Sequence, residues 1–194
     1  MTKNRIGFFG GTFNPVHRAH VDIANEFIEK FSLDMLYIIP NNIPPLKESH
    51  GVSGKERSEM LGIAFSGNNK VIISDIELKR SGMSYTCDTV DELKALHPES
   101  EIYMLMGDDW IDRFDKWKNY RYILENVHLV IAYRGLSDLT EFLDMAEAVS
   151  GRRPSLLDNQ KQKISSTAAR ERLDKSLLPD GVYEYIIERG LYLK

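Results

Sequence analysis

The stretch that decides the fold is IGFFGGTFNPVHRAH, which spans residues 6–20. The apolar run at residues 6–9 predicts a strand, and a helical pattern of apolar residues begins near His20. Between them stand Gly10 and Gly11, which let the backbone approach a ligand closely. A strand, a glycine turn and a helix N-terminus favour a phosphate site. A purely structural tight turn is the alternative, because neither G-x-G-x-x-G nor G-x-x-x-x-G-K-[ST] occurs in the sequence.

Short apolar runs recur along the chain and alternate with segments of helical periodicity. Each run is continuous, as in strands that are buried on both faces of a parallel sheet. The expected strands are residues 6–9, 35–39, 71–76, 102–106, 127–133 and 155–157. The expected helices are residues 21–31, 54–65, 86–96, 111–124 and 139–149. The alternation predicts an α/β fold with a doubly wound parallel sheet, helices on both faces, and ligands outside the carboxyl ends of the strands.

No internal repeat or linker divides the sequence, so we expect residues 1–194 to form a single domain. After Ile164, two helical segments follow each other without a clear strand, which predicts a C-terminal helical segment. Pro179 suits the first turn of the second helix, and Gly190 suits its C-terminal cap. Residues 40–54 are irregular and rich in proline, and a loop of that length is usually functional or disordered.

Composition and charge exclude several classes of protein. The sequence is 42% hydrophobic and 28% charged, as in ordinary globular proteins. Its formal net charge of -4 lacks the basic footprint of a nucleic-acid or anionic-membrane binder. The single cysteine, Cys87, cannot form an intrachain disulfide, and we find neither a secretory signal nor a long apolar run. We therefore expect a cytoplasmic protein that binds no nucleic acid and spans no membrane.

Two polar clusters at opposite ends of the sequence can bind anions. His17 and His20 are three positions apart at a helix start, so both can project toward the glycine turn. A metal site is one alternative, although no Cys or His cluster accompanies the pair, and two unrelated surface histidines are another. Ser165 and Ser166 mark a helix N-cap, with Arg170 on the same side as Ser166, and capping alone is the alternative there. Together the clusters could hold a polyphosphate.

Both clusters belong to a recognisable pattern. Residues 10–20 resemble the signature G-G-[ST]-F-[DN]-P-x-H-x-G-H of the HxGH nucleotidyltransferases, and residues 164–170 resemble their I-S-S-T-x-x-R signature. Ala19 stands where the first signature usually has Gly, and we expect a slight narrowing beside the nucleotide.

Within that superfamily, nearly the whole sequence is similar to the bacterial-type nicotinate-nucleotide adenylyltransferases. Residues 40–47 resemble their P-x-x-x-P-P-x-K loop, residues 57–64 resemble R-x-x-M-x-x-x-A, and residues 84–89 resemble S-Y-T-x-D-T. The remaining matches are Gly107 and Asp109 to G-x-D, Trp117 to the downstream W, and residues 178–192 to L-P-x-x-V-x-x-Y-I-x-x-x-x-L-Y.

The resemblance implies a Rossmann-like enzyme of NAD biosynthesis that transfers the adenylyl group of ATP to nicotinate mononucleotide, with Mg²⁺ accompanying ATP. It makes His17, His20 and Arg170 the catalytic residues. Carried over in the same way, the ATP-binding residues are Gly10, Gly11, Thr12, Phe13, His17, His20, Gly107, Asp109, Ile164, Ser165, Ser166 and Arg170. The mononucleotide-binding residues are Asn14, Lys47, Thr86 and Trp117. Arg134 is either near the nucleotide or simply exposed.

The implied chemistry needs no general base, because a phosphate monoester is already ionised near neutral pH. Three alternatives stay open. The phosphopantetheine enzyme of the same superfamily has Thr where this sequence has His17, which argues against it. The nicotinamide mononucleotide enzyme differs by one substrate group, and a nucleotide-binding module without catalysis is the third. The sequence also leaves open that the protein forms a homo-oligomer.

Overall fold

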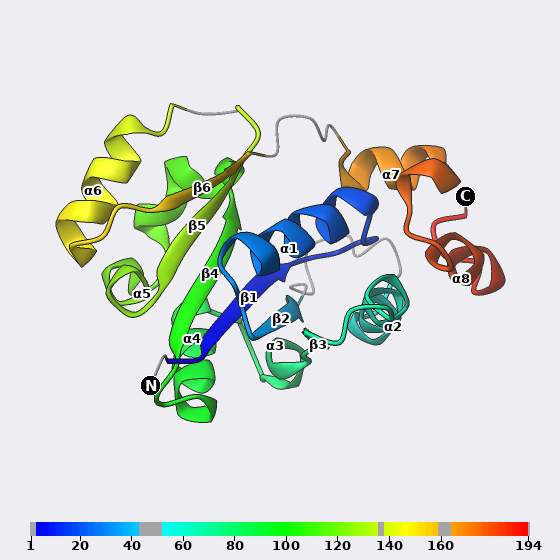
Figure 1. Ribbon diagram of the computed structural model, residues 1–194. Coiled ribbons are helices and arrows are strands. Elements are labelled where there is room, and N and C mark those ends of the chain that lie inside the picture. The colour runs from blue at the N-terminus through cyan, green and yellow to red at the C-terminus, as the bar shows by residue number, and fades with distance from the viewer. Residues whose placement is uncertain (1–2, 43–51, 136–137, 159–163, 194) are drawn as a thin grey trace.

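The protein is built around a twisted parallel β-sheet (Figure 1). The computed structural model describes residues 3–42, 52–135, 138–158 and 164–193. Within these residues, six strands pair in the order β3-β2-β1-β4-β5-β6, and each neighbouring pair is parallel. The strands are β1 Arg5–Gly11, β2 Met35–Pro40, β3 Val71–Ile73, β4 Glu101–Gly107, β5 His128–Tyr133 and β6 Ser155–Asp158.

Helices pack against both faces of the sheet. The first face carries α1 Arg18–Lys30 and α2 Gly54–Ala64. The helices α7 Ser166–Arg172 and α8 Val182–Glu188 share the same core, with α8 packed on α2. The second face carries α4 Thr86–Leu96, α5 Tyr120–Asn126 and α6 Thr140–Ser150. The short helix α3 Ile76–Lys79 lies beside β2. These layers confirm the predicted doubly wound α/β fold with its C-terminal helical segment.

Strand β4 shows why its sequence is continuously apolar. Ile102 and Met104 are buried in the core on the α4–α6 side, and Tyr103 and Leu105 are buried in the core on the α1 side. Alternate residues of a strand point to opposite faces, so a strand covered on both sides needs apolar residues at every position.

The strand order places a ligand crevice at the middle of the sheet. β1 pairs with β2 on one side and with β4 on the other. The connections that leave β1 and β4 therefore run in opposite directions, which opens a crevice at their carboxyl ends. Gly11 and Gly107 are the last residues of these two strands.

The predicted strand at residues 71–76 is wrong at its C-terminal half. β3 ends at Ile73, and Ile76 begins α3 after Asp75 as its N-cap. β3 is at the edge of the sheet and pairs only with β2, over three residues. Ile76 packs against the core on the α4–α6 side, but it does so from a helix rather than from a strand.

The predicted helix at residues 111–124 is two elements. A 3₁₀ helix, Asp108–Lys116, is followed by an extended Trp117 and by α5, whose N-cap Asn119 has a left-handed φ of 53°. Ile111 and Ile123, from the two elements, are buried in the same cluster. The helical periodicity therefore persists across a break that the left-handed residue creates.

The C-terminal segment differs from the prediction in one detail. α8 begins at Val182 after the N-cap Gly181, so Pro179 lies before the helix rather than in its first turn. Between α7 and α8 lies a short 3₁₀ turn, Lys175–Leu177. Gly190 adopts a left-handed φ of 64° directly after α8, as predicted for a helix C-terminus.

Some expectations fall beyond what the structure tests. Most of the irregular stretch at residues 40–54 lies outside the described residues. Among those that are described, no helix has both the length and the apolar character to cross a membrane. The cytoplasmic location stays a prediction.

Close packing of α1 on β1 requires glycine at position 7. A Cβ there would lie 2.5 Å from Cδ1 of Leu33 and 3.1 Å from Cε1 of Phe27, whereas a Cβ at Gly62 in α2 would meet nothing within 4 Å. We expect Gly7→Ala to lower the free energy of unfolding by about 1–3 kcal/mol through overpacking. The control Gly62→Ala should raise it by about 0.5–1 kcal/mol, since Ala is the better helix former. Urea unfolding measures both, and a fully stable Gly7→Ala variant would contradict the packing argument.

Candidate active site

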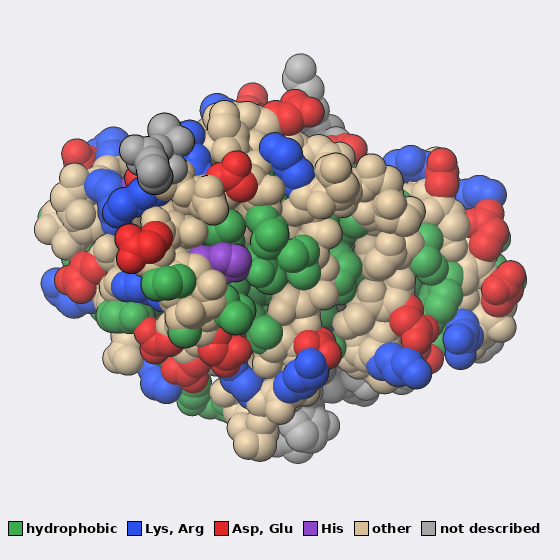
Figure 2. All heavy atoms as spheres, turned by 60° about the horizontal axis from the view of Figure 1, so that its bottom comes forward, with side chains coloured by type: hydrophobic (Ala, Val, Ile, Leu, Met, Phe, Trp, Pro, Cys, Tyr) green, Lys and Arg blue, Asp and Glu red, His purple; other side chains and the backbone are tan. Residues whose placement is uncertain are grey.

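A cavity of about 640 Å³ opens at the carboxyl ends of β1 and β4. Its walls come from the turn after β1, the starts of α1 and α4, the segment after β4, the turn after β5, and the start of α7. On the face shown in Figure 2, histidine lies among hydrophobic side chains, with acidic and basic side chains around them. The volume is in the range of small-molecule sites.

The glycines predicted to form a turn are instead the end of β1, where Gly10 and Gly11 pair with β2 and present bare backbone to the cavity. Gly10 lines the cavity, and a Cβ built on it would meet no atom within 4 Å. A side chain at Gly10 would therefore project into the space that a ligand needs. Thr12 and Phe13 continue the wall, and Phe13 holds a left-handed φ of 47° while its ring is buried.

A buried arginine fixes the start of the loop between β1 and α1. The side chain of Arg57, in α2, is 1% exposed. Its Nη1 donates to the carbonyl oxygen of Thr12 at 2.7 Å, and its Nη2 donates to that of Asn41 at 2.9 Å. Arg57 thus ties the residues that follow β1 to those that follow β2.

The C-terminal segment fixes the rest of the same loop. Arg170 Nη1 donates to the carbonyl oxygen of Asn14 at 2.5 Å, and the Tyr192 hydroxyl donates to Asn14 Oδ1. Ser166 Oγ donates to the carbonyl oxygen of Pro15 at 3.1 Å. Residues at the two ends of the sequence therefore meet at the mouth of the cavity.

The start of α7 carries the N-cap that the hydroxyl run predicts. Ser165 is the N-cap residue, and its Oγ accepts the backbone N–H of Ala168 at 3.2 Å. Ile164, Ser165 and Ser166 all line the cavity. The predicted capping role of Ser165 is confirmed, and the residue faces the site as well.

His17 and His20 form a stacked pair at the start of α1. His17 is the N-cap residue of α1, and the two rings stack with their centroids 3.6 Å apart. The backbone N–H of His17 donates to Nδ1 of His20 at 3.2 Å. A neutral imidazole has one acceptor and one donor nitrogen, so this bond places the proton of His20 on Nε2. Both histidines line the cavity.

Burial and a neighbouring cation keep both histidines uncharged. Burial, followed by the Arg134 guanidinium, lowers the pKa of His17 from its usual 6.5 to about 4. Burial, then His17 and then Arg134, lowers the pKa of His20 well below its usual value. In the ligand-free protein at neutral pH, the pair therefore offers hydrogen-bond donors and acceptors rather than positive charge.

Arg134 is the fixed cation beside the histidines. It follows β5 and lines the cavity. Asp108, which is fully buried, accepts the backbone N–H of Arg134 at 2.8 Å and its Nε at 3.3 Å. Asp109 Oδ1 accepts Nη2 of Arg134 at 2.7 Å. These two carboxylates set the orientation of the guanidinium.

The opposite side of the cavity is aromatic and ends at a helix N-terminus. Thr86, the first residue of α4, and Trp117 both line it. The Trp117 ring packs against Phe114 at 5.0 Å and against Trp110 at 5.7 Å between centroids. The first N–H groups of a helix lack carbonyl partners within it, so the start of α4 can bind a carboxylate.

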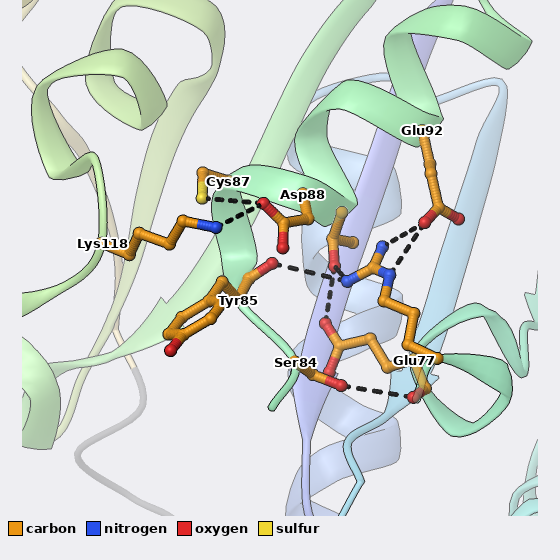
Figure 3. Close-up of polar contacts among 9 residues, drawn as sticks. Glu77, Ser84, Tyr85, Cys87, Asp88, Glu92 and Lys118 are labelled. Atoms are coloured by element: carbon orange, nitrogen blue, oxygen red, sulfur yellow. Dashed lines mark hydrogen bonds and ion pairs between the residues drawn. The ribbon is translucent and has the colours of Figure 1, made fainter. Parts of the chain in front are cut away.

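Lys118, the residue after Trp117, contacts this helix start (Figure 3). Its Nζ donates to Asp88 Oδ1 at 3.2 Å and lies 4.4 Å from the centre of the Tyr85 ring. Tyr85 is the N-cap residue of α4, and Asp88 is in its first turn. The Trp117 segment and the start of α4 are therefore one connected wall.

Comparisons with known proteins agree with this geometry. Residues 8–172 match the Cytidylyltransferase-like family. A protein of Dictyoglomus thermophilum named "Probable nicotinate-nucleotide adenylyltransferase" is 36% identical over 97% of this chain and 100% of its own length. A Psychromonas ingrahamii protein of the same name is 37% identical over 98% of each chain. This chain belongs to the nicotinate-nucleotide adenylyltransferase family.

Solved structures show the same fold at lower identity. The Plasmodium falciparum nicotinic acid mononucleotide adenylyltransferase complexed with NaAD has a TM-score of 0.79 to this chain, with 22% identity and 97% of each chain covered. A second structure of that enzyme, complexed with APC, has a TM-score of 0.77. The likeness confirms the predicted Rossmann-like architecture.

The structure of this adenylyltransferase brings most of the predicted site residues together. Those that line the cavity are Gly10, Gly11, Thr12, Phe13, His17, His20, Thr86, Gly107, Asp109, Trp117, Ile164, Ser165 and Ser166. Asn14 and Arg170 are not part of the lining and instead contact each other beside it. Lys47 lies outside the described residues. That the residues of the cavity lining contact ATP or the mononucleotide stays a prediction.

Sequence patterns missed the residues that hold the site in shape. Arg57 is part of the R-x-x-M-x-x-x-A match, and that match alone could have indicated it. Tyr192 is likewise part of the tail match. Asp108 precedes Asp109 without any local signal that it is the buried one. For Arg134, the sequence left two alternatives, and the structure places it in the cavity wall.

Ala19 stands where the family usually has Gly, and it is 4% exposed and lines the cavity. Its methyl group therefore occupies space where glycine has only hydrogen. The expected slight narrowing beside the nucleotide stays a prediction, since it concerns a bound ligand.

The pKa of His17 gives a direct test of the site electrostatics. In the free enzyme, we expect the NMR shifts of His17 to remain those of a neutral imidazole from neutral pH to about pH 5. Arg134→Gln should raise this pKa, because it removes the neighbouring positive charge, while Arg153→Gln, on the surface near α6, should leave it unchanged. Because the unfolded chain binds more protons between about pH 6.5 and 4, this histidine should lower stability as the pH falls through that window. A His17 midpoint near 6.5 would contradict the assignment.

Proposed function

We propose that this enzyme joins the adenylyl group of ATP to nicotinate mononucleotide, which yields nicotinate adenine dinucleotide and pyrophosphate in NAD biosynthesis. The observation that carries the proposal is that one cavity has two chemically different halves. The phosphate half holds the glycines at the end of β1, His17, His20 and Arg134. The base half holds Trp117 and the start of α4 at Thr86. A nucleotide triphosphate and an aromatic mononucleotide fit these halves.

The phosphate half can stabilise negative charge that grows on the leaving group. His20 Nε2–H is a neutral donor, Arg134 is a permanent cation, and α1 turns the positive end of its dipole toward the same place. Such preorganised donors act most strongly on the charge of the transition state. The catalytic role of His17 and His20 is part of the proposal.

The reaction itself is an in-line displacement at the α-phosphorus of ATP. An oxygen of the mononucleotide phosphate forms the new bond to the α-phosphorus, and the bond to the bridging oxygen breaks, so that the electron pair leaves with pyrophosphate. The attacking phosphate is ionised near neutral pH, with its second pKa at about 6. The enzyme's work is therefore positioning and charge stabilisation, and His20 acts as a donor rather than as a base.

The base half supports a preference for the acid over the amide. The pyridine ring would stack on Trp117, and the carboxylate would accept N–H groups at the start of α4 and the Thr86 hydroxyl. An amide in the same place carries no negative charge for the helix terminus and brings an NH₂ group toward N–H donors. The loss of matched partners is what separates such substrates.

We infer that Mg²⁺ enters with ATP and is held mainly by phosphate oxygens and water, since Mg²⁺ keeps several water ligands in such sites. The carboxylates of the cavity lining are Asp109 and Glu77. Asp109 is half exposed, and only its Oδ1 is paired with Arg134. Its carboxylate would therefore be available to the hydration shell of the ion. The ion would supply charge neutralisation to the triphosphate.

A coupled assay with purified protein tests the proposal. With MgATP, nicotinate mononucleotide should give dinucleotide and pyrophosphate with a kcat/KM at least roughly 10-fold above that of nicotinamide mononucleotide. The two tryptophans, Trp110 and Trp117, both line the cavity, so mononucleotide binding should also change the intrinsic fluorescence. Equal or reversed kcat/KM values would assign the enzyme to amide-using or dual-specificity chemistry.

Substitutions of His20, in the phosphate half, and of Arg170, beside the cavity, test the proposed catalytic residues. We expect His20→Ala to lower kcat by roughly 10²–10³-fold while the KM for the mononucleotide changes little. Arg170→Ala should lower kcat by a smaller factor, because Arg170 reaches the site only through the loop that it holds at Asn14. Arg170→Ala should also lower the melting temperature, because Arg170 donates to the carbonyl of Asn14. Steady-state kinetics beside thermal melts separate these effects. An Arg170→Ala variant that melts early yet turns over normally would reduce Arg170 to a structural residue.

A further inference from the structure

Figure 3 shows a chain of four hydrogen-bonded polar side chains, of which Glu77 lines the cavity and Arg80, Thr89 and Glu92 do not. Glu92 Oε1 accepts Nε of Arg80 at 2.8 Å, and Nη1 of Arg80 donates to Thr89 Oγ1 at 2.9 Å. Thr89 Oγ1 in turn donates to Glu77 Oε1 at 2.7 Å. Glu77 comes from α3, Arg80 follows α3, and Thr89 and Glu92 belong to α4.

The direction of every bond in this chain is determined by chemistry. A guanidinium only donates, so the Thr89 oxygen must accept from Arg80. An ionised Glu77 can only accept, so the single hydroxyl proton of Thr89 is donated to its Oε1. Because each side chain can only donate or only accept at each contact, the series has one pattern of hydrogen bonds, and these bonds polarise one another.

The chain is anchored to the segment that faces the mononucleotide base. Ser84 Oγ donates to the backbone carbonyl of Glu77 at 3.2 Å, and Arg80 Nη1 also approaches the carbonyl of Tyr85 at 3.5 Å. Ser84, Tyr85 and Thr86 all line the cavity. The residues before them are solvent-exposed, with Met83 at 65%, so this side of the segment has little packing to hold it.

Burial makes the chain costly unless it is complete. Thr89 is 1% exposed and Glu77 is 8% exposed. Burial raises the pKa of Glu77, while the Thr89 hydroxyl bond and the Arg80 charge lower it. Buried ionic groups contribute little net stability against an apolar alternative, and their best-documented use is to specify one conformation. Buried polar side chains beside a substrate subsite therefore suggest that they fix the conformation of the neighbouring backbone.

We propose that Glu77, Arg80 and Thr89 are positioning residues that hold residues 84–86 in the geometry that distinguishes nicotinate from nicotinamide mononucleotide. The inference rests on the proposed function, because it assumes that residues 84–86 face the acid or amide group. Thr89 and Arg80 do not line the cavity, so they act through the segment rather than on the substrate. Discrimination between a carboxylate and an amide depends on donor positions, which a loosened segment would blur.

Thr89→Val tests the inference, since it removes only the hydroxyl that links Arg80 to Glu77 and keeps the side-chain shape. We expect the KM for nicotinate mononucleotide to rise roughly 10-fold and the acid-to-amide ratio of kcat/KM to fall by a similar factor. The KM for ATP should stay within about 2-fold, because ATP uses the other half. The matched control is Thr140→Val, which also removes a hydroxyl bond, from Thr140 to Asp138, but lies far from the base half at the start of α6.

Hydrogen exchange supplies a readout that needs no substrate. The backbone N–H of Asp88 donates to the carbonyl of Tyr85 at 3.0 Å, so its exchange reports on that carbonyl. It should exchange faster in Thr89→Val than in the wild type or in Thr140→Val. Glu92→Gln is a milder variant, because the Glu92 side chain is 44% exposed, and it should shift the acid-to-amide ratio in the same direction by a smaller factor.

Each outcome decides a different claim. If the wild type discriminates and both Thr89→Val and Glu92→Gln retain its ratio, the positioning role is overturned even when the variants melt early. If exchange at Asp88 is unchanged, the network does not hold the segment. If the wild-type enzyme itself shows no preference for the acid, the proposed function fails, and the role in discrimination fails with it.

Discussion

The active site depends on how the chain satisfies the backbone carbonyl groups of residues 12–15. These residues lie between β1 and α1, so neither a strand ladder nor a helix supplies their partners. Arg57, Ser166 and Arg170 donate to three of the four carbonyls from α2 and α7. Because these donors come from distant parts of the sequence, the loop acquires its shape only when α2 and the C-terminal helices have packed on the sheet. The loop at residues 12–15 is thus a product of tertiary structure, although the glycines that precede it belong to a locally determined strand.

The electrostatics of the site follow from one buried carboxylate. Asp108 is fully buried and orients Arg134. Burial is the main cause that lowers the pKa values of His17 and His20, and Arg134 lowers both further. The positive charge of the free enzyme is therefore concentrated on a group that does not lose its proton, and the imidazoles stay neutral. Protonation of His20 would also break the bond that its Nδ1 accepts from the backbone N–H of His17. In the proposed reaction the imidazoles therefore serve as neutral donors beside a permanent cation.

The sequence predicts what local pattern controls and misses what side-chain direction controls. The continuous apolar strands are local, and the structure confirms them apart from residues 74–76. The expected turn at Gly10 and Gly11 is wrong, because these glycines still pair with β2 as the end of β1. Arg57 is a charged residue in a helix, and only the carbonyls of two distant loops explain its burial. The spacing of Arg170 from Ser166 gives the side of the helix, but its guanidinium turns to Asn14 instead of the cavity. The break at Asn119 escapes periodicity because the segments on both sides of it are buried in the same cluster.

The two halves of the cavity are held by different means, and the sheet fixes the distance between them. In the phosphate half, side chains that donate to backbone carbonyls hold the loop. In the base half, the proposed support is the series of side-chain hydrogen bonds from Glu92 to Glu77. Adenylyl transfer needs the attacking and leaving oxygens in line, so the halves must keep a constant separation. The histidines follow β1 and Trp117 follows β4 along the chain, and these two strands pair directly, with Phe9 beside Leu105. A slip of one residue would turn each side chain to the opposite face, so burial on both faces locks this register. The hydrophobic pattern of two strands thereby determines where two substrates meet.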